Sequence, residues 1–303
     1  MSSKVNSFFR TYGKVLGLFL AMLSGGLVPQ VHEFASLIRY LVMTMLFFAF
    51  LDTEFNPRSF QRSVLWILVA NTAVAFLSYS IFASKDITLA LAAFMTGIAP
   101  SAIAAPVLIS FIEGQVEYVL AAVLLTNVSS AIIIPLALPS LVGGVVSISV
   151  WSVLQSSLIV MFVPLILAKL AVRLPSDTQA VIRKGKRFSF ILWLLSLFLV
   201  SAKASDFLRN ENTGSLTLLL YIALISLGIC VFNFTLGAWI GGRQYRREAS
   251  QALGQKNLSF VIWIALAFIN PLVAMGPTFY ILYHHLYNSW IIYRFEKGRI
   301  RVL

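Results

Sequence analysis

Charged side chains are scarce in this 303-residue chain: Asp and Glu number 11, Lys and Arg number 23, and together they form 11% of the sequence. Soluble domains carry about 25% charged and about 45–50% apolar residues, whereas 59% of this chain is hydrophobic. The composition argues against an ordinary soluble enzyme, a disordered protein and a coiled coil. It predicts a polytopic all-α membrane protein.

Cysteine and the common catalytic patterns are also nearly missing. The one cysteine, Cys230, lies in an apolar run and has no partner for an internal disulfide, which favours a packing role. The sequence contains no P-loop, no dinucleotide fingerprint, no zinc-ligand spacing and no catalytic triad. We therefore expect neither an enzyme nor a bound cofactor or metal ion.

Long apolar runs between polar breaks dominate what is present. A bilayer-spanning helix needs about 20 residues, and runs near that length predict ten spans. These spans lie at about 13–29, 34–51, 61–82, 87–111, 116–139, 147–170, 187–203, 216–240, 249–270 and 272–295.

The basic residues are distributed unevenly around these spans. Eighteen of the 23 Lys and Arg residues fall on one side of the predicted membrane, three fall on the other, and Arg39 and Lys256 lie within spans. Because cytoplasmic loops are enriched in Lys and Arg, we expect a multi-pass protein of the cell (inner) membrane with both termini in the cytoplasm. The net charge of +12 then reflects membrane anchoring, and nucleic acid is not an expected partner.

Ten spans divide into two halves of five, the second of which would be inserted upside down. Spans 2, 3 and 4, shifted by about 157 residues, fall on spans 7, 8 and 9. Such inverted repeats are common in secondary transporters. The basic segment 173–187 is the natural joint, so residues 1–170 hold the first five spans plus span 6, and 171–303 hold the remainder of the second repeat.

Spans 4 and 9 are interrupted in corresponding positions. Span 4 contains TGIAPS from Thr96 to Ser101 and a second proline at Pro106, and span 9 contains ALGQKN from Ala252 to Asn257. Proline and glycine open the helical backbone, and opened backbone in a membrane is tolerated where it is buried in protein or lines a cavity. Paired broken helices point to a transporter's binding site; a simple kink is the alternative for either span alone.

Lys256 lies seven residues into span 9, roughly 10 Å deep at 1.5 Å per residue. An ionisable group at that depth usually faces a cavity or a partner. Apart from Glu117, which belongs to the loop at the approximate start of span 5, no acidic residue lies inside a predicted span, so an anionic ligand would supply the missing counter-charge. A snorkelling lysine or a misplaced span end is the alternative.

Other polar residues inside spans are weaker candidates. Thr126, Asn127, Ser129 and Ser130 form a patch in span 5 that serves either the site or interhelical hydrogen bonding. Arg39 fits a snorkelling side chain, the adjacent His284 and His285 fit interhelical hydrogen bonds better than a metal pair, and Gly237 and Gly241 fit a small-xxx-small helix contact. The predicted substrate-binding set is Lys256, Asn257, Gln255, Gly97, Pro100, Ser101, Thr126, Asn127 and His284.

Two segments resemble the bile acid:sodium symporter family. Residues 97–141, from GIAPS through Gly114 to Pro135, resemble that family's broken span 4 and span 5, and GQKN at 254–257 is similar to its E-x-G-x-Q-N motif in span 9. The resemblance implies a panel domain of spans 1, 2, 6 and 7 and a core domain of spans 3–5 and 8–10. It also implies that the broken helices cross in the core and that organic anions bind between the domains by alternating access.

The family's sodium ligands are not preserved. The resemblance places its ligand positions on side chains that offer no oxygen, namely Ala105, Pro106, Val119, Val123 and Ala252. A gap in the alignment would bring in Thr126 but would not restore the missing carboxylate. The family's glutamine falls on Lys256, and Asn257 remains.

Charge arithmetic suggests what replaces sodium. The resemblance implies two sodium ions and one glutamate at the crossing, a net charge of +1, and Lys256 without the glutamate also gives +1. We therefore expect a sodium-independent secondary transporter of a small organic anion, with Lys256 as a surrogate cation. It would act as a uniporter, an exchanger or a proton-coupled carrier. The alternatives are a sodium-coupled symporter with displaced ion sites and a non-transporting membrane receptor or scaffold of the same fold.

Overall fold

The computed structural model describes residues 2–51, 61–143, 149–210 and 216–296, and these residues form helices and no strand. The first half of the chain contains α1 (Ser2–Leu27), the 3-10 helix η1 (Pro29–Leu37), α2 (Ile38–Phe50), α3 (Arg62–Ala83), α4 (Ile87–Ile98), α5 (Ala105–Phe111) and α6 (Val116–Leu141). The second half contains α7 (Val150–Ala171), α8 (Ser176–Gly185), η3 (Lys186–Phe188), α9 (Ser189–Asn210), α10 (Leu216–Gly241), α11 (Arg246–Gly254), α12 (Leu258–Phe268) and α13 (Pro271–Glu296).

Several helical segments suit a bilayer. Six of those described are long and apolar enough to cross a membrane: Pro29–Phe50, Arg62–Ala83, Val116–Leu141, Val150–Ala171, Ser176–Asn210 and Leu216–Gly241. Large apolar side chains also cover their outer faces; Trp151 is 68% exposed and Trp239 is 79% exposed. Exposed apolar area on this scale is unfavourable in water and favourable in lipid. The expectation of an all-α integral membrane protein is confirmed.

Two of the predicted spans are built from pairs of short helices. α4 has 12 residues and α12 has 11, which is about 16–18 Å at 1.5 Å per residue and less than the ~30 Å hydrocarbon core. α4 ends before the irregular segment 99–104 and continues as α5, and α11 ends before 255–257 and continues as α12. Both breaks lie at the interruptions that the sequence predicts.

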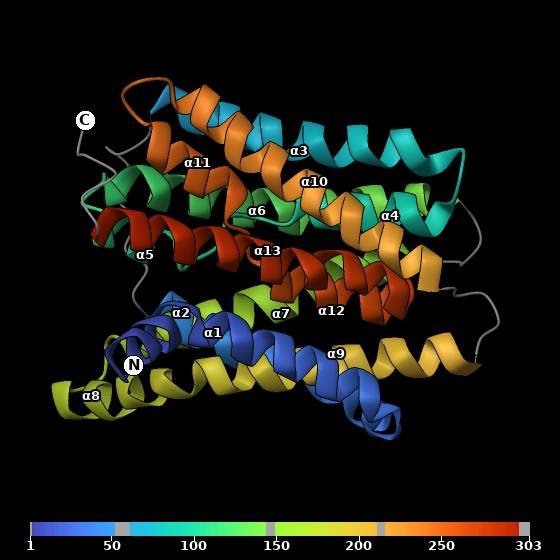
Figure 1. The fold of residues 1–303 in the computed structure, drawn as a ribbon, viewed down its shortest axis with the longest axis horizontal. Helices are drawn as coiled ribbons and strands as arrows, with labels where there is room; N and C mark the ends of the chain where they lie inside the picture. The colour runs from blue at the N-terminus through green and yellow to red at the C-terminus, as the bar shows by residue number, and fades with distance from the viewer. Residues whose placement is uncertain (1, 52–60, 144–148, 211–215, 297–303) are drawn as a thin grey trace.

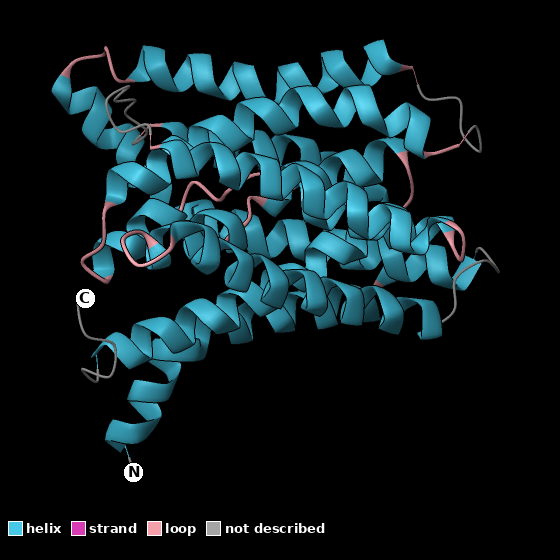
Figure 2. Cartoon of the chain, turned by 90° about the horizontal axis from the view of Figure 1, so that it is seen from above, coloured by secondary structure: helices cyan, strands magenta, loops and turns pink. Residues whose placement is uncertain are grey.

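The helices differ from the predicted spans and loops in two places. α1 begins at Ser2, ahead of the predicted start at about residue 13, because polar residues extend the helix beyond its apolar part; Figure 2 shows these first turns projecting from the bundle. α8 lies in the basic segment that was predicted as a loop. It has Asp177 in its first turn and Arg183 in its last, which complements the helix dipole, and none of its side chains is buried.

The helices form a bundle whose long axis is horizontal in Figure 1. On one side, α9 packs against α1 and α2, and α2 packs against α7. On the other side, α3 packs against α4 and α6, and α10 packs against α11 and α13. α12 contacts α2 and α7 as well as α4 and α13, so it lies between the two groups. Figure 2 shows irregular segments inside the helical bundle.

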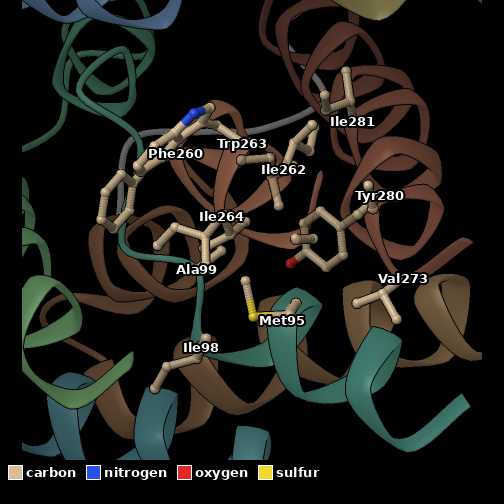
Figure 3. Packing of buried hydrophobic residues seen from close by; sticks show 14 of the residues in the cluster. Met95, Ile98, Ala99, Phe260, Ile262, Trp263, Ile264, Val273, Tyr280 and Ile281 are labelled. Atoms are coloured by element: carbon tan, nitrogen blue, oxygen red, sulfur yellow. The ribbon is translucent and has the colours of Figure 1, made fainter. Parts of the chain in front are cut away.

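Apolar side chains fill most of the interior between α4, α12 and α13. Figure 3 shows Met95 of α4 beside Ile264 of α12 and Tyr280 of α13, and Met95, Ile264 and Tyr280 are each 0% exposed. Glycine permits the closest approaches: a Cβ at Gly97 would lie 2.7 Å from the Cα of Ala75 on α3. This tight packing fixes the broken end of α4 in the middle of the bundle.

The predicted glycine contact in α10 is also present. A Cβ at Gly237 would lie 2.4 Å from the carbonyl oxygen of Ala249, and one at Gly241 would lie 2.7 Å from the Cβ of Ala249. α10 and α11 therefore meet through their backbones, and this contact positions the helix that leads to Lys256.

Candidate functional site

The two helix breaks cross each other and share their backbone hydrogen bonds. Ser101 and Lys256 form an isolated antiparallel bridge, flanked by the Ala102 N–H donating to the Gln255 carbonyl at 2.8 Å and the Asn257 N–H donating to the Pro100 carbonyl at 2.7 Å. Unpaired backbone groups are costly inside a membrane protein, so each break satisfies the other. Neither span is merely kinked.

Pro100 accounts for the end of α4. The residue before a proline is driven out of the helical region by a steric clash, and Ala99 has φ −50° and ψ 131°. Three side chains of α6 then bond the freed groups. Ser101 N–H donates to Thr126 Oγ1 at 3.0 Å, Asn127 Nδ2 donates to the Ser101 carbonyl at 2.9 Å, and Ser130 Oγ donates to the Ile98 carbonyl at 2.9 Å. The polar patch of α6 therefore makes interhelical hydrogen bonds.

Lys256 is 2% exposed and its ammonium points into the bundle. Nζ donates to the Gly97 carbonyl at 2.9 Å and to the side-chain oxygen of Asn71 on α3. Because the C-terminal end of a helix carries partial negative charge, the ammonium stabilises the broken end of α4. The side chain does not snorkel, and no ion pair among the described residues involves it.

Asn71 links the Lys256 ammonium to the C-terminal end of α4. The side chain is 1% exposed, and its Nδ2 donates to the Ile98 carbonyl at 3.2 Å while its oxygen accepts from Lys256. One amide therefore holds both the last carbonyl of α4 and the ammonium. The predicted substrate-binding set does not include Asn71. The one sequence signal that could have identified this residue is the position of an amide inside an apolar run.

The residues at the family's sodium-ligand positions lie in one buried apolar cluster. Ala105, Val119, Val123 and Ala252 belong to this cluster together with other alanines, and Pro106 is buried beside them. Sodium, a hard cation, prefers oxygen ligands, and these side chains offer none. The nearby Ser101 hydroxyl donates to the Ala252 carbonyl.

A cavity of about 190 Å³ lies between the crossing and the helices α2 and α9. Four residues of the predicted substrate set line it: Gln255, Lys256, Asn257 and His284. Five others, Gly97, Pro100, Ser101, Thr126 and Asn127, are not part of its wall and instead build the crossing. The wall also includes residues that the sequence did not single out for substrate: Val42, Met45, Leu46 and Ala49 of α2, Ala102–Ala104, Trp193, Leu258, Ser259 and His285.

The cavity wall holds polar groups that the protein itself does not bond. The Oε1 atom of Gln255 and the Nε2 atom of His284 are buried without a hydrogen-bond partner. His284 Nδ1 accepts the Lys256 N–H at 3.4 Å, so Nε2 carries the ring proton and is a donor. α12 begins at Leu258 with Asn257 as its N-cap, and the first N–H groups of a helix carry partial positive charge. These donors suit an anion.

Two further side chains hold the crossing in place. Tyr280 Oη donates to the Gly254 carbonyl at 2.7 Å and accepts from Asn233 Nδ2 at 3.2 Å. The guanidinium of Arg39 lies 5.8 Å from the ring centroid of Trp263 on α12, a cation–π contact that joins α2 to the crossing. The charged end of Arg39 therefore contacts the protein, and a snorkelling role for it stays a prediction.

The chain was also compared with known proteins. No protein-family model matches it, and no curated protein matches it.

Proposed function

We propose that the chain is a secondary transporter of a small organic anion that works by alternating access. The observation that carries the proposal is the crossing itself: two broken helices, one from each half of the chain, meet beside a cavity with unbonded donors. Half-helix ends at the membrane midplane are the usual binding sites of secondary transporters. The resemblance to the bile acid:sodium symporter family points to the same class.

The helix positions support two inverted repeats of five spans each, and the distribution of Lys and Arg supports termini in the cytoplasm. α2, α3 and α4, shifted by about 157 residues, overlap α9, α10 and α11. The two breaks thus fall in corresponding spans, as an inverted repeat requires. In this proposal α1, α2, α7 and α9 form the panel domain, the remaining spans form the core domain, and the cavity of about 190 Å³ lies between them.

The charge of Lys256 supports a carrier that needs no sodium. In secondary transporters the carbonyl ends of broken helices coordinate the coupling cation, and here the ammonium occupies that position between Gly97 and Asn71. The ammonium points toward Gly97 and Asn71 and is not directed at the substrate. It therefore attracts an anion through its electric field and not by direct contact. The anion itself is bound by His284 Nε2 and the α12 N-terminus, and the Gln255 Oε1 atom can accept a hydrogen bond from a hydroxyl group of the same ligand.

The cavity limits the size of the anion. Ligand pockets usually measure about 300–1,000 Å³, and this one measures about 190 Å³. The conformation described here therefore accepts an anion of few heavy atoms, and a larger one requires the panel to move away from the crossing. Movement of this kind is what alternating access involves.

Cysteine accessibility tests the proposal against a non-transporting scaffold. Ser259 lies on the cavity wall, and Cys230 is the one native cysteine. Ser259→Cys in a Cys230→Ala background should react with an impermeant thiol reagent from either side of the membrane. Lys184→Cys on exposed α8 is the control and should react from one side. Labelling of Ser259→Cys from one side only contradicts transport.

A ligand screen completes the test. Small organic anions are added to the purified protein in sodium and in choline buffers, and thermal stability is measured. A ligand that binds the native state raises the melting temperature by mass action, and we expect the same rise in both buffers. A rise that requires sodium supports a sodium-coupled symporter instead.

A further inference from the structure

Two adjoining cavities lie away from the crossing, on the outer side of α10. The first measures about 770 Å³ and runs between α10 and α13; the second measures about 520 Å³ and lies between the turn at 112–115, α11 and α13. Both are lined by Ala238, Arg243, Arg246 and Tyr287. The two cavities therefore form one continuous groove.

The first cavity has an apolar wall that faces outward. Val231 is 59% exposed, Trp239 is 79% exposed and Leu286 is 46% exposed, and all three line it. α10 is one of the helices long and apolar enough to cross a membrane, so this wall faces the hydrocarbon of the bilayer. An acyl chain is the natural occupant of such a groove.

The second cavity has a polar, positively charged end. Arg243, Arg246 and Arg247 line it together with Glu113 and Glu248, which leaves one positive charge in excess. The Glu248 carboxylate accepts the Gln115 N–H at 2.9 Å, and Arg247 donates to the Ile112 carbonyl at 3.3 Å. Among the described residues no acidic side chain forms an ion pair with Arg243 or Arg246. These two guanidinium groups remain available for a phosphate.

Gln251 supplies an independent sign of a ligand. It lines the second cavity, is 1% exposed, and neither its side-chain nitrogen nor its oxygen has a hydrogen-bond partner. Buried amides without partners are rare because leaving them unbonded is costly. The amide can donate to a phosphate and accept from a hydroxyl of the same headgroup.

We propose that this groove binds one anionic phospholipid. Its acyl chain lies along α10 and α13, its phosphate lies between Arg243 and Arg246, and its glycerol headgroup bonds Gln251. Basic pockets between membrane helices at the cytoplasmic face are typical lipid headgroup sites, and both loops that form this end are predicted to be cytoplasmic. The lipid bridges α10, α11 and α13, so it braces the helix that leads to the crossing, independently of what is transported.

Trp239 gives a direct readout because it lines the groove. Phosphatidylglycerol or phosphatidylcholine with brominated chains is titrated into the full-length protein in detergent, and the quenching due to Trp239 is obtained by difference from Trp239→Phe. Each basic residue near the headgroup is worth about fivefold in affinity. We therefore expect phosphatidylglycerol to quench at a roughly 30-fold lower mole ratio than phosphatidylcholine.

Matched variants locate the site. Arg243→Gln/Arg246→Gln should abolish the preference for phosphatidylglycerol over phosphatidylcholine, and Gln251→Leu should reduce this preference severalfold. Arg173→Gln/Lys184→Gln removes the same charge from exposed positions before and on α8 and should leave the preference unchanged. Equal quenching by the two lipids, or a preference retained in Arg243→Gln/Arg246→Gln, overturns the proposal. Loss of the preference on adding soluble glycerol phosphate also overturns it, because the site would then take a free phosphate.

Discussion

The contact between Lys256 and Asn71 makes a quantitative prediction about stability. Asn71→Leu nearly preserves volume but removes the acceptor of the Lys256 ammonium and the donor to the Ile98 carbonyl. Lys256→Met removes the ammonium and leaves the oxygens of Asn71 and Gly97 buried and unbonded. Each single variant therefore leaves a polar group without its partner, whereas the double variant removes both members of the pair.

The expected coupling follows from the charge. A hydrogen bond to a charged group contributes about 1.5–3 kcal/mol, and groups in direct contact show coupling energies of this order in a double-mutant cycle. Asn71→Leu should therefore cost about 1.5–3 kcal/mol less in the Lys256→Met background than in the wild-type background. At about 2 °C per kcal/mol for a chain of this size, the two melting-temperature shifts should differ by about 3–6 °C.

The measurement is thermal unfolding of the wild type, both single variants and the double variant in the same detergent and buffer. Asn288→Leu is the matched control, because this asparagine is also buried, at 5% exposed, but lies on α13 and does not bond Lys256. Its effect should add to that of Lys256→Met within about 0.5 kcal/mol. Additive shifts for Asn71→Leu as well would show that the ammonium does not lie at the end of α4, and the reasoning about a surrogate cation would fail.

Three further predictions concern the ligand. Lys256→Met should weaken binding of a screened anion by more than the ~1 kcal/mol of a surface charge, and Lys256→Arg should restore it only in part because the planar guanidinium fits a point-charge site poorly. Calorimetric titration of the anion measures both effects. If folded Lys256→Met bound the anion as tightly as the wild type, the lysine would have no part in the mechanism. His284→Phe should weaken binding of the same anion roughly tenfold or more by removing a donor to a charged group. His284→Gln keeps an N–H group and should weaken binding less. Identical losses of affinity in the two variants would mean that Nε2 does not face the anion. Uptake into proteoliposomes should be unchanged when choline replaces sodium, and a collapse of uptake would refute the sodium-independent carrier.

The sequence predicts the helices and the breaks because both depend on local chemistry. Apolar runs and polar breaks locate the membrane helices, and Pro100 ends α4 by a clash with its own neighbour. Prediction is weaker for a helix that has neither an apolar run nor a proline break. α8 is mostly polar, and none of its side chains is buried. The hydrophobic signal that finds the other helices is therefore absent there.

The partners of the site residues could not be predicted from local patterns. The direction of the Lys256 side chain depends on where α3 and α4 pack, and 185 positions separate it from its acceptor Asn71. The same applies to the α6 patch, whose Thr126 and Asn127 were predicted to bind substrate and instead bond Ser101. A sequence shows that a buried polar group needs a partner, but the fold decides whether that partner is protein or ligand.

In the proposed transporter, a cation that belongs to the chain changes what can drive transport. A bound sodium ion enters from one side and leaves on the other, so its gradient contributes free energy to each cycle. The Lys256 ammonium is covalently attached and returns with the protein, so it can make the crossing attractive to an anion but cannot supply energy from an ion gradient. While the ammonium keeps its proton, net movement of the anion must follow the anion's own gradient or be exchanged against a second anion. The surrogate cation thus predicts a uniporter or an exchanger, and a proton-coupled carrier requires Lys256 to leave Gly97 and Asn71 and release its proton in one of the two states.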